Sequence, residues 1–274
     1  MISLNLRNLV FVALLVSVGN VYADDATHYL SPAEIDVSQQ FPTAQTDKTS
    51  PSLSDTLVYI STRQLNGTDR WNQAHADDVY SVEKVAPLFE SSIGVKLTPD
   101  NAGIILHTLD KARIDMENML KPVKIPPPAG RTRPYVQYPD LPACDHVGSD
   151  KDFQMNTSGS YPSQHAMWGM MWALVLAQLA PERSKEILAR GYQFGESRLI
   201  CGFHYPSDLE AGRYLAAVLF TRLQANAQFK QDLIDSKNQL ETIRGHATPQ
   251  MKKSVERAKA RIAREPIPPP MLGM

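Results

Sequence analysis

The sequence lacks a large charge of either sign, strand-like alternation and any long apolar run after its first residues. Its 28 Lys and Arg residues nearly balance 29 Asp and Glu residues, so the formal net charge is −1. This balance gives no support for a nucleic-acid partner. After Ala23 no stretch reaches the ~20 unbroken apolar residues of a membrane span, so we expect no stable membrane insertion. Without alternation or internal repeats, the pattern favours an all-α fold.

The N-terminus has the three-part layout of a secretory signal peptide. Arg7 precedes the apolar run Leu9–Val18, and a small-residue exit ends at Ala23. The run is too short to span a bilayer, and a short membrane anchor is the alternative interpretation. We expect residues 1–23 to be removed and the mature protein to be periplasmic.

Only two cysteines are present, Cys144 and Cys201. In an exported chain such a pair predicts one disulfide, because a metal site would need more ligands. A bond between them would fasten a proline-rich segment to the stretch around Cys201. No set of metal ligands is evident, and we expect neither a metal nor another cofactor.

The apolar and proline patterns divide the mature chain into three parts. Residues 24–50 predict an irregular N-terminal arm, and residues 51–223 predict a helical domain. Residues 224–274 predict a charged helical tail that breaks near Gly245–Pro249 and ends in a Pro-rich segment. Such a tail is more typical of a solvated or packing face than of a binding motif.

Within the helical domain, local signals place the elements. Helices are expected at Ser52–Leu65, Trp71–Val82, Pro99–Leu120, Ala166–Ala180, Pro181–Ser197 and from a Ser207 cap onward. Seven prolines make Lys121–Pro142 a long loop. The Met and Trp stripe at 167–172 predicts buried core rather than a lipid-binding face.

The stretch SRLICGFHYPSD contains the residues with the clearest chemical pattern. Asp208 falls in the first turn of a predicted helix, and His204 lies just before that turn. A carboxylate there can accept the Nδ1–H of His204, which leaves Nε2 as an oriented nucleophile or base. Arg198 ends the preceding helix and can reach the same pocket. The alternative is a purely structural His–Asp pair.

Two other segments are rich in groups that bind anions. The proline-rich loop carries four basic residues, Lys121, Lys124, Arg131 and Arg133. The guanidinium group of arginine can bind two phosphate oxygens at once through parallel N–H donors. In the stretch YPSQH, Ser163 caps a predicted helix, and the free N–H groups at the start of this helix form a potential anion-binding site.

Together these segments resemble the signature of the type-2 phosphatidic acid phosphatase superfamily, K-x6-R-P, P-S-G-H and S-R-x5-H-x3-D. The third block is matched in full by Ser197, Arg198, His204 and Asp208. Residues 131–223 are most similar to class A bacterial non-specific acid phosphatases. The resemblance implies a compact helical bundle of the vanadium haloperoxidase/acid phosphatase type.

The resemblance also implies a role for each matching residue. His204 would form a phosphohistidine, Asp208 would orient it, and His165 would protonate the leaving group and later activate water. The phosphoryl oxygens would be bound by Lys124, Arg133, Ser163, Gln164 and Arg198.

Two positions depart from the family signature. The family lysine falls where this chain has Pro126, so we expect an insertion to bring Lys124 to the site, with Lys121 as the alternative. Gln164 replaces the family glycine, and we expect it to be tolerated with an altered substrate preference.

The sequence thus predicts a broad-specificity phosphomonoesterase that acts on small phosphate esters with an acid-leaning pH profile. The alternatives are a more selective nucleotide or lipid-headgroup phosphatase, a vanadate-dependent haloperoxidase, and a non-catalytic phosphate binder. Whether the protein is a homo-oligomer, and which ester it meets in the cell, are left open.

Overall fold

The computed structural model describes residues 27–38, 52–124, 130–144 and 158–265. These residues form helices and no strands, which confirms the all-α prediction. The predicted signal peptide and the Pro-rich end lie outside them. The elements are η1 (Pro32–Glu34), α1 (Leu53–Thr62), η3 (Arg63–Leu65), α2 (Asp69–Ala76), α3 (Val82–Ile93), α4 (Pro99–Leu120), α5 (Pro134–Gln137), α7 (Gln164–Leu179), η4 (Pro181–Arg183), α8 (Ser184–Ile200), α9 (Pro206–Leu223), α10 (Ala227–Ile243) and α11 (Pro249–Ile262).

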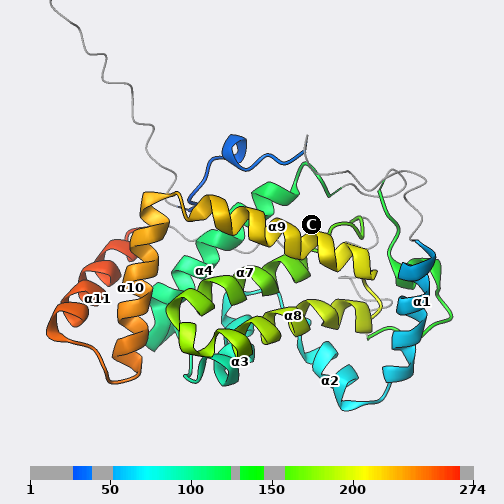
Figure 1. Ribbon diagram of the computed structural model, residues 1–274, viewed down its shortest axis with the longest axis horizontal. Helices are drawn as coiled ribbons and strands as arrows, with labels where there is room; N and C mark the ends of the chain where they lie inside the picture. Colours follow the sequence, from blue (N-terminus) through cyan, green and yellow to red (C-terminus); the bar gives the residue numbers. More distant parts are fainter. Residues whose placement is uncertain (1–26, 39–51, 125–129, 145–157, 266–274) are drawn as a thin grey trace, which may run out of the picture.

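Helix α7 runs through the middle of the bundle and packs against α8, α9 and α4 (Figure 1). Its side chains are apolar on nearly every face, which suits a helix enclosed by others. Met167 and Trp172 are fully buried in the main core, as the sequence predicted for this stripe. Among the described residues, no helix combines the length and apolar character of a membrane span.

Glycines bring the backbones of α7, α8 and α9 into direct contact. A Cβ on Gly191 of α8 would lie 2.5 Å from the Gly169 carbonyl oxygen of α7. A Cβ on Gly212 of α9 would lie 2.2 Å from the Ser163 carbonyl oxygen, at the start of α7. No larger side chain fits at these contacts without movement of a backbone. The starts of α7 and α9 and the end of α8 therefore meet at one end of the bundle (Figure 1).

The two C-terminal helices pack against α4. The side-chain oxygen of Gln239 in α10 accepts hydrogen bonds from the N–H groups of Ile104 and Ile105, at 2.9 and 3.0 Å. These bonds follow a kink in α4 at Ala102, where φ is −121°. In α11, Arg261 contacts Asp232 of α10 at 2.6 Å. The described part of the charged tail thus packs against the rest of the bundle. Its two helices are separated between Ile243 and Pro249, where the sequence predicted a break.

The described part of the N-terminal arm, residues 27–38, lies on α4 and α10. The N–H groups of Tyr29 and Leu30 each donate to the Asp115 carboxylate at 3.1 Å. The Tyr29 hydroxyl donates to Asp232 at 2.8 Å. These bonds connect the arm to the faces of two helices that are distant in sequence.

The prediction for residues 71–82 was wrong in its boundaries. Helix α2 ends at Ala76, and a separate helix, α3, begins at Val82. The chain leaves the helix at Asp77 because its carboxylate contacts Arg190 and Ser197 of α8. Helix α3 was not predicted, since Pro87 lies inside it and proline usually interrupts a helix.

The start of α9 also differs from the expected Ser207 cap. Tyr205 is the N-cap residue, Pro206 is the first helical residue, and Asp208 is the third. Proline favours the first helical position, where no N–H donor is needed, and so shifts the cap by two residues. Smaller differences are the short helix α5 inside the proline-rich loop and the 3-10 turn η4 before α8.

Replacing Gly212 by alanine tests the α7–α9 backbone contact. Because the new Cβ would overlap a carbonyl oxygen, we expect Gly212→Ala to lower the unfolding free energy by about 1–3 kcal/mol. The matched control is Gly103→Ala in α4, where a Cβ meets nothing within 4 Å. We expect this control to be neutral or stabilising by up to about 1 kcal/mol, since alanine favours helices. Equal melting temperatures for the two variants would contradict the contact.

Candidate active site

The three segments singled out in the sequence converge where α7 and α9 begin and α8 ends. The N–H of Ser163 donates to the Asp208 carbonyl at 2.9 Å, which joins the starts of α7 and α9. The N–H of Ser160 donates to the Arg131 carbonyl at 2.8 Å, which brings in the arginine-bearing loop. The N–H of Phe203 donates to the Arg198 carbonyl at 2.9 Å and turns the chain from α8 toward His204.

His204 is buried between a carboxylate and a guanidinium group. Its Nδ1 lies 3.4 Å from Asp208 Oδ2, and its Nε2 lies 3.1 Å from Arg133 Nη1. A carboxylate facing Nδ1 favours the Nδ1–H tautomer, so the lone pair is placed on Nε2. Nε2 is therefore the ring atom available for a bond to an electrophile beside Arg133.

The Asp208 carboxylate is satisfied on both oxygens. Oδ1 accepts from Arg131 at 2.7 Å, while Oδ2 accepts from the Ser160 hydroxyl at 2.5 Å and the Tyr205 N–H at 2.8 Å. The Tyr205 bond caps α9, so one side chain both starts this helix and faces His204. A buried carboxylate is tolerated when its lone pairs are occupied in this way.

Burial and nearby charges set the protonation of this pair. Burial lowers the pKa of His204 to about 3, aided by the positive charges of Arg133 and Lys124 and opposed by Asp208. Burial alone would raise the pKa of Asp208, but the hydrogen bond and charge of His204, with Arg131, lower it to about 2. The resting site thus holds a neutral imidazole beside an ionised carboxylate.

Arg133 and a second positively charged side chain, Lys124, lie beside His204. Arg133 donates to the carbonyl oxygens of Phe203 and Ser158, each at 3.2 Å. Lys124 donates to the Pro162 carbonyl at 2.8 Å, and burial and the Arg133 charge hold its pKa well below its usual value. Lys121, the alternative, is exposed and donates to Asn118 at 2.9 Å. The structure places Lys124 at the site and Lys121 away from it.

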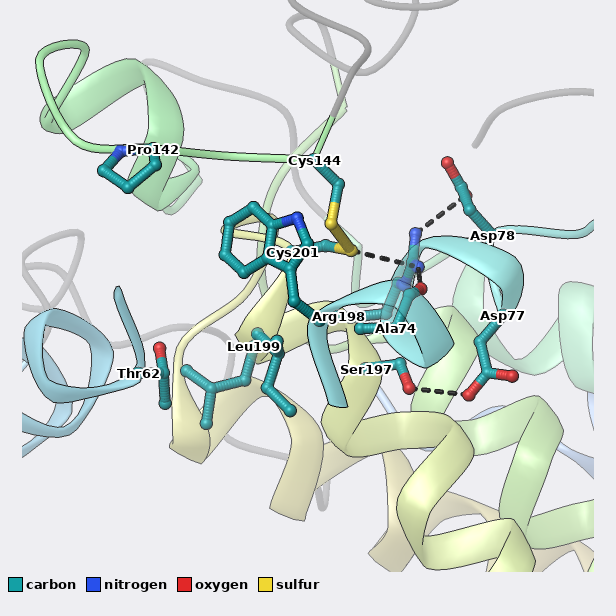
Figure 2. Close-up of a disulfide and its surroundings, with 12 residues drawn as sticks. Thr62, Ala74, Asp77, Asp78, Pro142, Cys144, Ser197, Arg198, Leu199 and Cys201 are labelled. Atoms are coloured by element: carbon teal, nitrogen blue, oxygen red, sulfur yellow. Dashed lines mark hydrogen bonds and ion pairs between the residues drawn. A yellow bond between two sulfur atoms is a disulfide. The ribbon is translucent and has the colours of Figure 1, made fainter. Parts of the chain in front are cut away.

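Arg198 approaches from the end of α8 and is almost fully buried. Nη1 donates to Asp78 at 2.7 Å, and Nη2 donates to the Ala74 carbonyl at 2.8 Å (Figure 2). Its Nε–H is buried and makes no hydrogen bond to any described residue. An unsatisfied buried donor is costly, and it marks a position where an anion can bind.

His165 in the first turn of α7 is held by ring contacts. It stacks on Phe194 with ring centroids 4.0 Å apart and meets the edge of Tyr80 at 5.7 Å. Neither ring nitrogen makes a hydrogen bond of standard geometry within the described chain. Burial, followed by the positive charge of Arg198, holds the pKa of His165 well below its usual value. This imidazole is neutral in the resting site, and its contact with the Asp77 backbone, which favours protonation, does not offset burial.

Comparison with known proteins identifies this arrangement. Residues 127–231, which carry His165, Arg198, His204 and Asp208 but not Lys124, match the PAP2 superfamily. The non-specific acid phosphatase of Salmonella typhimurium is 33% identical over 235 residues, which cover 85% of this chain and 92% of the relative. The chain belongs to the PAP2 superfamily. Within it, the chain is a phosphatase of the bacterial non-specific acid phosphatase group.

Two further relatives support this assignment. The non-specific acid phosphatase of Providencia stuartii is 33% identical over 70% of this chain and 75% of its own length. The acid phosphatase of Zymomonas mobilis is 33% identical over 70% of this chain and 71% of its own length.

At the start of α7 the phosphatase has a simple helix cap. The Ser163 hydroxyl accepts from the Ala166 N–H at 3.2 Å, as expected for an N-cap serine. Gln164 is the first residue of the helix, so this position uses ordinary helical backbone. The family glycine is therefore not required here for a left-handed conformation.

A disulfide joins Cys144 to Cys201, as the sequence predicted. The N–H of Cys144 also donates to the Cys201 carbonyl at 3.0 Å. Arg198 Nη2 lies 3.7 Å from Cys201 Sγ, so the bond adjoins the site (Figure 2). The disulfide fastens the loop that carries Arg131 and Arg133 to the end of α8.

The sequence analysis did not identify three polar residues at the site of the phosphatase, namely Asp55, Asp78 and Ser160. Asp55 in α1 accepts from the N–H and hydroxyl of Ser207, at 3.0 and 2.8 Å. Ser160 bonds Asp208, and Asp78 bonds Arg198. Asp55 has a capping-box signal in α1, but no local pattern connects any of the three with its distant partner.

Lysine substitutions test which cation serves the phosphatase. We expect Lys124→Gln to lower kcat/KM for p-nitrophenyl phosphate by on the order of 10²-fold, because one electrostatic contact to the reacting group is lost. The matched control, Lys121→Gln, removes the same charge from an exposed position and should stay within about twofold of wild type. The reverse pattern would assign the role to Lys121.

Proposed function

We propose that this phosphatase hydrolyses a broad range of phosphate monoesters through a phosphohistidine at His204. The observation that supports the proposal is the placement of His204, with Nδ1 facing Asp208 and Nε2 3.1 Å from Arg133 Nη1. An oriented neutral imidazole beside a fixed guanidinium group suits in-line attack on phosphorus, since phosphoryl transfer depends on positioning and charge neutralisation.

The reaction has two displacements. In the first, His204 Nε2 attacks phosphorus, the ester P–O bond breaks, and the leaving oxygen takes a proton from His165. In the second, His165 takes a proton from water, the water oxygen attacks phosphorus, and the P–N bond breaks to release inorganic phosphate. Arg133, Arg198 and Lys124 neutralise the phosphoryl oxygens in both, with the Ser163 hydroxyl and the Gln164 N–H as further donors.

The first displacement requires a protonated His165, whereas burial and Arg198 keep it neutral in the resting site. A bound phosphate ester brings two negative charges close to this ring and raises its pKa. Substrate binding and proton uptake are therefore coupled in the proposed mechanism. This coupling favours activity at acid pH, where protons are more available.

We also propose that catalysis needs no metal and that the protein is exported. All groups in the two displacements belong to this polypeptide, so activity should persist in EDTA.

The proposal of export rests on the signal-peptide pattern before Ala23. A mature protein beginning at Asp24, found by mass spectrometry of the periplasmic fraction, is the expected outcome.

Removing the nucleophile tests the covalent route. We expect His204→Ala to reduce hydrolysis of p-nitrophenyl phosphate by at least about 10³-fold, because the phosphohistidine cannot form. Rapid acid-free quenching of wild type with ³²P-labelled substrate should retain label on the protein, and the variant should retain none. Substantial activity in His204→Ala would exclude this residue as nucleophile.

The same assay separates the alternatives. Halide oxidation that appears only with added vanadate, without ester hydrolysis, would favour a haloperoxidase. Binding of phosphate without turnover by wild type would favour a non-catalytic binder. A rate on one nucleotide or one lipid headgroup ester far above the other esters would replace broad specificity by a selective phosphatase.

Sulfate binding tests the proton coupling, because sulfate is a dianion throughout the pH range used and does not react. At pH 6, calorimetry in two buffers of different ionisation enthalpy should reveal uptake of up to about one proton per sulfate bound. We expect His165→Asn to lose most of this uptake.

The control is His246→Asn, which alters an exposed tail histidine with 71% side-chain exposure. It should leave the uptake at the wild-type value. Equal uptake in wild type and His165→Asn would contradict His165 as the proton donor.

A further inference from the structure

Asp78 contacts one of the phosphate-binding arginines although it belongs to none of the three signature blocks. It lies between α2 and α3, and its Oδ1 accepts from Arg198 Nη1 at 2.7 Å (Figure 2). The two side chains are 4% and 2% exposed, respectively. Little water screens a pair at this depth, so its charges act strongly on their surroundings.

The remaining donors of Arg198 define where an anion can bind. Nη2 donates to the Ala74 carbonyl at 2.8 Å, next to the Asp78 bond, and the buried Nε–H makes no hydrogen bond to the described residues. The guanidinium is thus held at its two terminal nitrogens, and its Nε–H remains for an oxyanion. An incoming phosphate meets a cation whose charge is already balanced by a carboxylate.

Asp78 also acts on the leaving-group side of the site. Burial lowers the pKa of His165 most, and the positive charge of Arg198 lowers it further. The negative charge of Asp78 acts in the opposite direction and favours protonation of His165. Three other groups face His165. The Asp77 backbone also favours its protonation, whereas the charge of His204 lowers the pKa of His165. The third is Tyr80, whose own pKa is raised mainly by burial, with a smaller contribution from Asp78.

We propose that Asp78 is the resting counter-ion of Arg198, and that it weakens the site's hold on inorganic phosphate while supporting the proton donor His165. The proposal rests on the phosphatase function proposed above. Without this carboxylate, the charge of Arg198 would not be balanced and would attract phosphate more strongly. The inorganic phosphate product would then dissociate more slowly. Asp78 is a positioning residue, since it acts through Arg198 and His165 and has no step in the reaction.

The sign of the effect follows from charge alone. A buried carboxylate close to a bound dianion repels it, and removal of one such charge should strengthen anion binding by at least about tenfold. Damage to the fold would weaken binding instead. A gain in affinity is therefore a readout that a merely structural role cannot produce.

The experiment compares inhibition of p-nitrophenyl phosphate hydrolysis by inorganic phosphate in wild type and Asp78→Asn. Asparagine keeps an oxygen that can accept from Arg198 and removes only the charge. We expect the Ki for phosphate to fall at least about tenfold and KM to fall with it. The basic limb of the kcat profile should move to lower pH, because His165 loses the charge that favours its protonation.

Two variants control for general effects. Asp78→Glu keeps the charge and should stay within about threefold of the wild-type Ki. Asp77→Asn removes the neighbouring charge, which contacts Arg190 and Ser197 instead of Arg198. It should lower thermal stability and change the Ki by less than about threefold. If Asp78→Asn does not fold, Asp78→Ser provides a second uncharged side chain for the same measurement.

Each outcome has a distinct meaning. An unchanged or higher Ki in the uncharged Asp78 variants, with an active wild type, overturns the counter-ion role and leaves the phosphatase function standing. Equal tightening in Asp77→Asn overturns the specific pairing with Arg198. A wild type that neither hydrolyses the ester nor binds phosphate overturns the proposed function itself.

Discussion

The carboxylate of Asp208 is the interaction on which this site depends. It caps α9 through the Tyr205 N–H, binds Arg131 and Ser160, and faces His204. The carbonyl of the same residue accepts the N–H that precedes α7. One residue therefore positions three segments: the Arg131 loop, residues 160–163 and residues 204–208 at the start of α9. A buried carboxylate requires such partners in any fold, and here the partners are the parts of the candidate active site.

Charge balance explains why this fold favours an oxyanion. Two of the arginines are paired with carboxylates, Arg131 with Asp208 and Arg198 with Asp78. Lys124 instead contacts a carbonyl oxygen, which satisfies a hydrogen bond without neutralising charge. Burial of such a cation costs free energy, and the phosphate of the proposed reaction would recover it. In the proposed mechanism, binding of the anion thus stabilises the fold as well as preparing the chemistry.

Local signals in the sequence were sufficient for much of the fold. The Ser163 cap, the bounds of α4 and the position of Asp208 in a first helical turn all depend on neighbouring residues, and the structure confirms them. The spacing of the third signature block placed His204 within reach of Asp208 for the same reason. Two cysteines leave a single intramolecular pairing, and the structure contains it.

Other features depend on contacts between distant residues, which no local pattern encodes. Asp78 and Arg198 are 120 positions apart, and Asp55 and Ser207 are 152 apart. The choice between Lys124 and Lys121 depended on the path of the proline-rich loop, which spacing alone does not fix. Helix α3 was missed because Pro87 opposes a helix locally, while the buried faces of Val85 and Phe89 stabilise it in the core.

The backbone contact between Gly212 and Ser163 restricts how such a site can change. The two imidazoles of the proposed mechanism, His165 and His204, lie near the starts of helices that already touch. Sliding or spreading these helices to admit a bulkier ester would break the contact. Room for a larger alcohol group therefore has to come from side chains away from this backbone contact, while the spacing of the two helix starts is kept.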